Sequence, residues 1–216
     1  MREVLVFTRT TGYRHESIEA GVAAVQILAE SDGFTVTHTE DPAIFEPERL
    51  ADVAVVVWLS TSGDVLEDGQ REAFARWLAA GGAWAGIHAA STAEPSWPEF
   101  AKIVGARFTD HPPVQTGRVH VEDPHHWSTN LLPEVWEHTD EWYNFDRNPR
   151  GEVQVLLTAD EGSYEGGGMG TDHPIAWTSR YGAGQCWYTA LGHGPDLYAN
   201  PRFLSHLAGG LRSLWS

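Results

Sequence analysis

Short runs of apolar residues alternate with segments of helical spacing up to residue 88. Runs without polar alternation are typical of strands buried on both faces of a parallel sheet, and they occupy residues 3–8, 52–58 and 83–87. An alternating run at residues 34–39 predicts a strand nearer an edge. Helical spacing lies between the runs, at residues 17–30 and 67–80, with a short helix or turn at 42–50. This succession predicts right-handed crossovers and a mostly parallel α/β sheet.

The rhythm changes after residue 88. Residues 97–104 predict a helix closed by Gly105, and Asn200 with Pro201 predicts the start of a last helix that ends near residue 214. Between these helices, polar alternation and a hairpin-like turn predict additional antiparallel strands at residues 114–122, 135–142, 153–158, 174–178 and 185–191. Neither a repeat nor a linker interrupts the pattern. We therefore expect a single domain over residues 1–216.

Composition narrows the class of partner. The net charge of −16 argues against nucleic acid and anionic membranes, which require concentrated Lys and Arg. One cysteine, Cys186, excludes an intrachain disulfide and fits a reducing, cytoplasmic compartment. The start of the chain has no signal-peptide pattern. The glycine-rich residues 161–171 are too irregular for a phosphate fingerprint, so we expect no nucleotide cofactor.

Ten Trp and eleven His are the unusual part of the composition. Aromatic rings stack on sugar faces, which makes the tryptophans compatible with a saccharide partner, but most of them are expected in the core. An acidic chain rich in tryptophan is also compatible with a homodimer, although the pattern locates no interface. We expect Cys186 to be a buried apolar residue in a strand.

His88 ends the buried run at residues 83–87. A polar side chain at the carboxyl end of such a strand faces the crevice where open α/β sheets bind ligands. Residues 86–90, Gly-Ile-His-Ala-Ala, have the spacing of a nucleophile elbow, with histidine in the nucleophile's position. A histidine that ends a buried strand needs a partner, so a functional site is favoured over a core position.

Further candidates follow other strands. His15 lies in the loop after the first strand, where capping the next helix is an equal alternative, and His193 ends a late strand between two glycines. Asp140 and Glu141 are adjacent, so on a strand they face opposite sides and one of them is expected in the site. His111 and His173 are binding candidates with the alternative of hydrogen-bonding their own turns. Five further histidines are interpreted as surface or structural residues: His120, His125, His126, His138 and His206.

Two chemistries suit a cluster of histidines with a carboxylate. One is general acid–base catalysis by His15, His88 and His193 with Asp140 or Glu141. The other is a divalent metal ion, zinc or manganese, held by the same three histidines. Because the sequence has no local metal-binding spacing, distant loops would have to supply the ligands.

Six segments together resemble a known family. They are Gly-Tyr-Arg-His, Gly-Gly-Ala-Trp-Ala-Gly-Ile-His-Ala-Ala, Gly-Ala-Arg-Phe-Thr-Asp-His-Pro, Asp-Glu-Trp-Tyr, His-Pro-Ile-Ala-Trp and Tyr-Gly-Ala-Gly-Gln-Cys-Trp-Tyr-Thr-Ala-Leu-Gly-His. Over nearly the full chain, this order resembles the trehalose-utilisation (ThuA-like) proteins. The resemblance implies a flavodoxin-like three-layer sandwich, similar to class I glutamine amidotransferases.

The amidotransferase comparison fails at the decisive positions. His88 stands where the nucleophilic cysteine would be, and His193 matches the triad histidine. Pro195 occupies the usual position of the triad acid, and Asp196 is one residue further on. A cysteine-dependent glutaminase is therefore excluded.

The resemblance implies a role in glycoside or disaccharide catabolism. We expect an enzyme that acts on an oxidised, 3-keto saccharide as a lyase, hydrolase or isomerase. Residues expected to orient the sugar are Arg14, Ser60, Thr61, His111, Tyr143 and His173. The alternative is a non-catalytic saccharide-binding or accessory protein on a degenerate amidotransferase scaffold.

Overall fold

One sheet of nine strands forms the centre of the protein, in the order β2-β1-β3-β4-β11-β10-β9-β6-β7. The computed structural model describes residues 3–215. The strands from β2 to β11 pair in parallel, and they are β2 (Thr35–Thr39), β1 (Glu3–Phe7), β3 (Val53–Leu59), β4 (Ala83–Ile87) and β11 (Gly184–Thr189). The apolar runs of β1, β3 and β4 are almost wholly buried, as the absence of polar alternation predicts.

The strands beyond β11 pair antiparallel. They are β10 (His173–Tyr181), β9 (Gln154–Asp160), β6 (Gln115–Val121) and β7 (Val135–Asp140). A hairpin turn joins β10 to β11, and its Gly182 has a φ of +60°, which glycine adopts without strain. The last strand of the chain therefore lies in the middle of the sheet, between β4 and β10.

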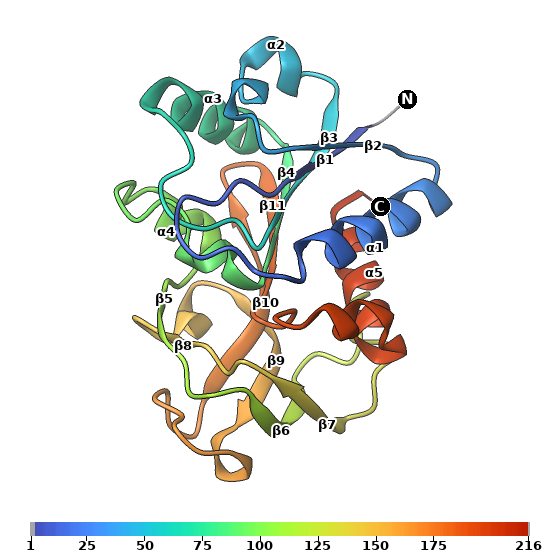
Figure 1. Cartoon of the computed structure of the whole chain (residues 1–216), viewed down its shortest axis with the longest axis vertical. Coiled ribbons are helices and arrows are strands. Elements are labelled where there is room, and N and C mark those ends of the chain that lie inside the picture. Colours follow the sequence, from blue (N-terminus) through green and yellow to red (C-terminus); the bar gives the residue numbers. More distant parts are fainter. Residues whose placement is uncertain (1–2, 216) are drawn as a thin grey trace.

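Helices cover both faces of the parallel half, which completes a three-layer, flavodoxin-like sandwich (Figure 1). On one side lie α1 (Ile18–Ser31) and α5 (Pro201–Trp215), and α5 contacts β3, β4 and β11. On the other side lie α2 (Pro47–Leu50), α3 (Asp68–Ala79) and α4 (Phe100–Val104). Short 3-10 turns are η1 (Pro42–Ile44), η2 (His88–Thr92), η3 (Pro149–Gly151), η4 (Glu161–Ser163) and η5 (Pro195–Ala199). No helix within residues 3–215 is long and apolar enough to span a bilayer.

Buried tryptophans fill the core, as expected. Trp58, Trp84, Trp142, Trp177 and Trp187 are nearly or completely inaccessible to solvent. Each buried indole removes roughly 200 Å² from water, which contributes about 5 kcal/mol at 25 cal/mol per Å². Cys186 is buried in β11, as predicted, and burial raises the pKa of its thiol to about 12.

Three local expectations differ from the structure. The helix predicted at 97–104 begins only at Phe100, because the Arg107 guanidinium binds the carbonyl oxygens of Ala93, Glu94 and Trp97 at 2.8–2.9 Å and fixes a non-helical path. The strand predicted at 135–142 ends at Asp140. A separate two-stranded sheet of β5 (Phe108–Asp110) and β8 (Asn144–Phe145) was not predicted, because such short strands show no periodicity.

Candidate functional site

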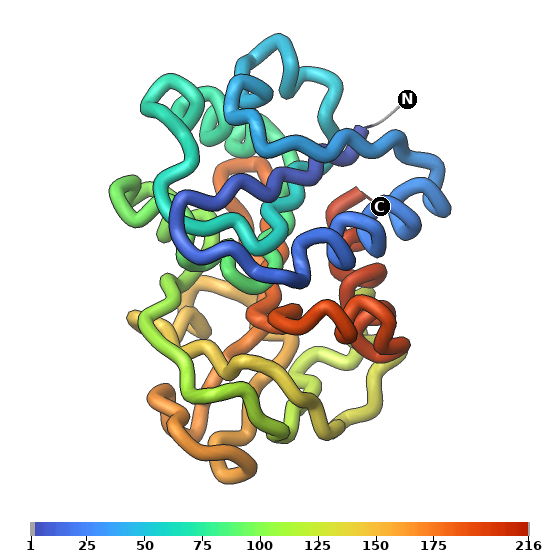
Figure 2. Tube along the Cα trace, in the orientation of Figure 1, coloured from blue at the N-terminus to red at the C-terminus, as the bar shows by residue number. Residues whose placement is uncertain are grey.

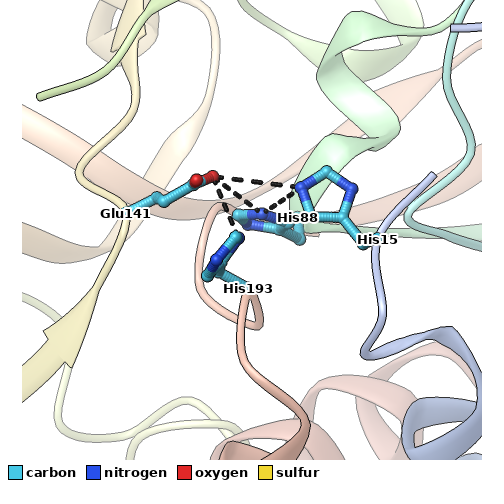
Figure 3. A group of neighbouring side chains, drawn as sticks. All are labelled: His15, His88, Glu141 and His193. Atoms are coloured by element: carbon cyan, nitrogen blue, oxygen red, sulfur yellow. Dashed lines mark hydrogen bonds and ion pairs between the residues drawn. The ribbon is translucent and has the colours of Figure 1, made fainter. Parts of the chain in front are cut away.

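Four side chains from distant parts of the sequence meet at the carboxyl edge of the parallel strands. His15 follows β1, His88 follows β4, Glu141 follows β7 and His193 follows β11. The loops that follow β1, β4 and β11 come close together along the chain trace (Figure 2). One nitrogen or oxygen atom from each residue lies within 4.8 Å of those of the other three, and the side chains point toward one another (Figure 3).

His88 sits on a strained turn between β4 and η2. Its φ is +53°, in the left-handed region that side chains other than glycine rarely adopt. The Tyr188 hydroxyl donates to the His88 carbonyl oxygen at 2.9 Å and helps to hold the turn. The His88 Nδ1–H donates to the Ala190 carbonyl oxygen at 2.6 Å. In the neutral ring the lone pair is therefore on Nε2, which faces the cluster.

Glu141 supplies the negative charge of the cluster. Its Oε2 lies 3.2 Å from His193 Nδ1, 3.4 Å from His88 Nε2 and 3.9 Å from His15 Nε2. Burial raises the pKa of Glu141, but its close contacts with the imidazoles of His15, His193 and His88 outweigh burial and hold this pKa far below its ordinary value. The carboxylate is thus ionised at neutral pH.

Asp140 lies behind the cluster. It is fully buried and accepts the backbone N–H groups of Glu141, Gly192 and His193 at 2.8–3.1 Å, and His138 Nε2 lies 3.1 Å away. Burial raises the pKa of Asp140, whereas the contact with His138 and the charge on His88 lower it, and the net pKa is below the ordinary value. Of the two adjacent acids, Glu141 faces the histidines and Asp140 holds the loops that carry Glu141 and His193.

The donor set fits a divalent metal ion. Burial lowers the pKa of His15, which favours the neutral imidazole that metals bind. Contact with Glu141 raises the pKa of His193. His193 Nδ1 is buried and out of line for a hydrogen bond, although it lies 3.2 Å from Glu141 Oε2. Three imidazoles and one carboxylate suit zinc, or manganese in a higher coordination number.

A cavity of about 410 Å³ opens beside the cluster. Its aromatic wall comprises Tyr13, Phe108 and Tyr143, and its other lining residues are His15, Ser62, Ala89, Thr92, His111 and Glu141. Sequence reasoning missed Tyr13, Ser62 and Phe108. Tyr13 and Phe108 lie in two of the segments that carry the family resemblance, but no role was expected of either, and Phe108 is in the unpredicted strand β5. No motif distinguishes Ser62 from other loop residues.

His111 and Tyr143 both reach the cluster from the cavity side. His111 Nε2 lies 3.5 Å from Glu141 Oε1, while its Nδ1–H donates to the Pro112 carbonyl oxygen at 2.9 Å. His111 therefore both hydrogen-bonds its own turn and presents Nε2 to the cavity. The Tyr143 hydroxyl lies 2.9 Å from His88 Nε2.

Four residues expected to orient a sugar lie elsewhere. Arg14 is at the surface and pairs with Glu40 at 2.8 Å. Ser60 and Thr61 are fully buried, and the Thr61 hydroxyl donates to a carbonyl oxygen in β1. His173 is fully buried behind Tyr143. None of the four lines the cavity, so their role in orienting a sugar stays a prediction. Thr61 and His173 make buried hydrogen bonds, and the buried Ser60 hydroxyl has no partner among the described residues.

Comparison with known proteins identifies the family of the chain. The profile of the ThuA family, described as trehalose utilisation, matches residues 3–215. The chain belongs to the ThuA family. Membership implies a role related to trehalose utilisation. No curated protein sequence matches the chain.

Solved structures of ThuA-like proteins have a similar fold. A ThuA-like protein from Bacteroides uniformis superposes with a TM-score of 0.85 at 25% identity, over 99% of this chain and 91% of that one. One from Parabacteroides merdae gives 0.77 at 20% identity, over 99% and 90%. A cytoplasmic protein from Salmonella typhimurium LT2 gives 0.69 at 12% identity, over 98% and 99%, and shares the fold.

Proposed function

We propose that this ThuA protein is a metal-dependent enzyme that acts on an oxidised, 3-keto saccharide. The observation that carries the proposal is the convergence of His15, His88, Glu141 and His193 beside a cavity with an aromatic wall. Aromatic rings stack on sugar faces, and an ion at the cluster would lie next to the sugar. We further propose a cytoplasmic location, which the single cysteine supports.

A keto group gives this site a reaction to perform. The carbonyl at C3 of a keto sugar acidifies the proton on C2. His111 Nε2, whose lone pair faces the cavity, takes that proton. The C2–H electron pair moves into a C2–C3 double bond, and the carbonyl oxygen gains the negative charge that a divalent cation stabilises.

The enolate then has two outcomes. In a lyase step the C3 carbonyl re-forms, the C2–C3 electron pair becomes a C1–C2 double bond, and the C1–O pair leaves with the C1 substituent, which takes up a proton. Later addition of water makes the sum a hydrolysis. If a proton returns to carbon at another position, the reaction is an isomerisation. The geometry of His111 and Glu141 suits the shared first step.

Metal analysis with matched variants tests the proposal. We expect near-stoichiometric zinc or manganese in protein purified without chelator, and loss of the ion in His88→Ala and His193→Ala. The control is His125→Ala, an exposed histidine outside the cluster. Turnover of 3-keto trehalose or a similar keto glycoside is expected from the loaded wild type and not from the two cluster variants.

Two results would overturn this function. Absence of the ion from wild type and variants alike would remove the metal and favour plain histidine acid–base catalysis. Saccharide binding without turnover, altered but not abolished in His88→Ala, would favour the non-catalytic binding protein instead.

A further inference from the structure

The Tyr143 hydroxyl lies next to His88 Nε2, the nitrogen atom through which His88 would bind a metal ion. The His88 Nδ1–H already donates to Ala190, so the neutral ring has one lone pair, on Nε2. Two groups lie within hydrogen-bond distance of that Nε2: His15 Nε2 at 3.1 Å and Tyr143 Oη at 2.9 Å. The Tyr143 hydroxyl is the donor of its pair. An ion bound to His88 uses the same lone pair. The ion and the Tyr143 hydroxyl therefore compete for one atom.

The Tyr143 ring itself is fixed. It is 2% exposed, and its centroid lies 4.5 Å from the His88 ring on one side and 4.5 Å from the Phe108 ring on the other. Its backbone carbonyl oxygen accepts the His173 Nε2–H at 2.8 Å. When the hydroxyl loses its acceptor, the ring stays in place and only the O–H bond turns about the C–O axis.

The direction in which the hydroxyl turns follows from its surroundings. Tyr143 lines the same cavity as His15 and Glu141, so its oxygen borders both the cluster and the space for substrate. A buried O–H without a partner costs free energy. Two acceptors are then within its reach: the Glu141 carboxylate, which an ion would occupy as a ligand, and a substrate oxygen beside the ion. A hydrogen-bond donor held in place next to an oxygen that becomes negatively charged lowers the energy of the transition state.

We propose that Tyr143 is a catalytic residue of the metal-dependent site argued above: its hydroxyl releases His88 Nε2 to the ion and donates a hydrogen bond to the substrate oxygen that becomes negatively charged. The tyrosine keeps its proton, so no further base or co-reactant is needed. This role depends on the proposed function, because only an ion on His88 displaces the hydroxyl.

Azide binding to the cobalt-loaded protein tests this role. Cobalt(II) reports through its visible spectrum, and azide is a small anion that takes the open position beside the ion. In Tyr143→Phe we expect azide affinity to fall about 10- to 100-fold, since a hydrogen bond to a charged group is lost. Cobalt affinity is expected to stay equal or to rise by up to about 5-fold, because a competitor for His88 Nε2 is removed.

The matched control is Tyr181→Phe, a partly buried tyrosine at the end of β10 whose hydroxyl donates to Glu99 and which does not line the cavity. Its azide and cobalt affinities are expected to equal those of wild type. Equal azide affinity in Tyr143→Phe and wild type would overturn the inference and leave the metal-dependent function standing. A more than tenfold loss of cobalt affinity in Tyr143→Phe would also overturn it, by showing a structural role. Failure of wild type to bind cobalt would overturn the proposed function and this role together.

Discussion

Asp140 fixes the position of His193 through the backbone. Its Oδ1 accepts the His193 N–H at 3.1 Å, and its Oδ2 accepts the N–H of Gly192 at 2.8 Å. The same carboxylate accepts the N–H of Glu141 at 2.9 Å. One buried acid therefore aligns two residues of the cluster that come from opposite halves of the sheet.

Asp140→Asn is expected to weaken both the fold and the site. The amide replaces one acceptor oxygen with an NH₂ group that faces backbone N–H donors. We expect the free energy of unfolding to fall by about 2 kcal/mol and metal affinity to fall about 10- to 100-fold. Urea denaturation and metal titration measure the two effects. Asp68→Asn, whose side chain is 95% exposed, is the control. Unchanged metal affinity in Asp140→Asn would show that Asp140 only stabilises the fold.

His111→Gln should separate the base from the metal ligands. The variant removes Nε2 from the cavity, together with its 3.5 Å contact with Glu141 Oε1, but leaves all four cluster side chains in the chain. We expect unchanged metal content and a fall in kcat on a keto glycoside of about 10²- to 10⁴-fold. His120→Gln, at an exposed position outside the cavity, provides the comparison. Loss of metal from His111→Gln would instead make His111 a ligand.

Stability is expected to fall on acidification through His206. Burial lowers the pKa of His206 to about 4, and the positive charges of His126 and His138 act in the same direction, against a hydrogen bond to the Ser128 carbonyl oxygen. Between pH 6.5 and 4 the unfolded chain binds a proton that the folded chain does not. The free energy of unfolding therefore decreases by about 3 kcal/mol as the pH falls through this range.

Urea denaturation between pH 7.5 and 4 measures this effect. His206→Gln, which cannot titrate, should lose the corresponding part of the pH dependence, although it is less stable at pH 7.5. His125→Gln, an exposed histidine, should retain it. Identical pH profiles for wild type and His206→Gln would show that other groups cause the loss.

Gly210 allows α5 to approach the centre of the sheet. A Cβ atom at this position would overlap the Trp187 indole in β11. We expect Gly210→Ala to lower the free energy of unfolding by about 1–3 kcal/mol through overpacking. Gly69→Ala in α3 is the matched control, because a Cβ there meets no atom within 4 Å. The control should be neutral or stabilising by up to about 1 kcal/mol. Equal stability of Gly210→Ala and wild type would show that α5 can shift away from the sheet.

The sequence predicts the fold well because buried parallel strands have a strong pattern. The runs that become β1, β3 and β4 are apolar on both faces, apart from Glu3 at the start of β1. His15, His88 and His193 could be singled out because each follows a strand at the edge where such sheets bind ligands. β5 and β8, by contrast, are too short to show a period.

The hydrogen-bond partners of the polar side chains could not be predicted from the sequence. The choice between Asp140 and Glu141 depends on backbone N–H groups fifty-two and fifty-three residues away, which no local pattern contains. Thr61 and His173 have residue types that suit a binding site, yet their hydrogen bonds are made inside the protein. Thr61 donates to a backbone oxygen, and His173 bonds the Tyr143 carbonyl oxygen and the Tyr164 hydroxyl. Polarity in a loop does not distinguish these two uses.

The central position of β11 in the sheet affects the order in which the sheet can form during synthesis. Residues 3–87 form one half of the sheet and residues 115–181 the other, but the strand between them, Gly184–Thr189, leaves the ribosome after both. Until β11 is synthesised, the edges of β4 and β10 that it pairs with stay unpaired. Unpaired strand edges can associate with other chains. We expect slow folding, late formation of the histidine cluster and a dependence on chaperones during synthesis that a helical protein of this length would not have.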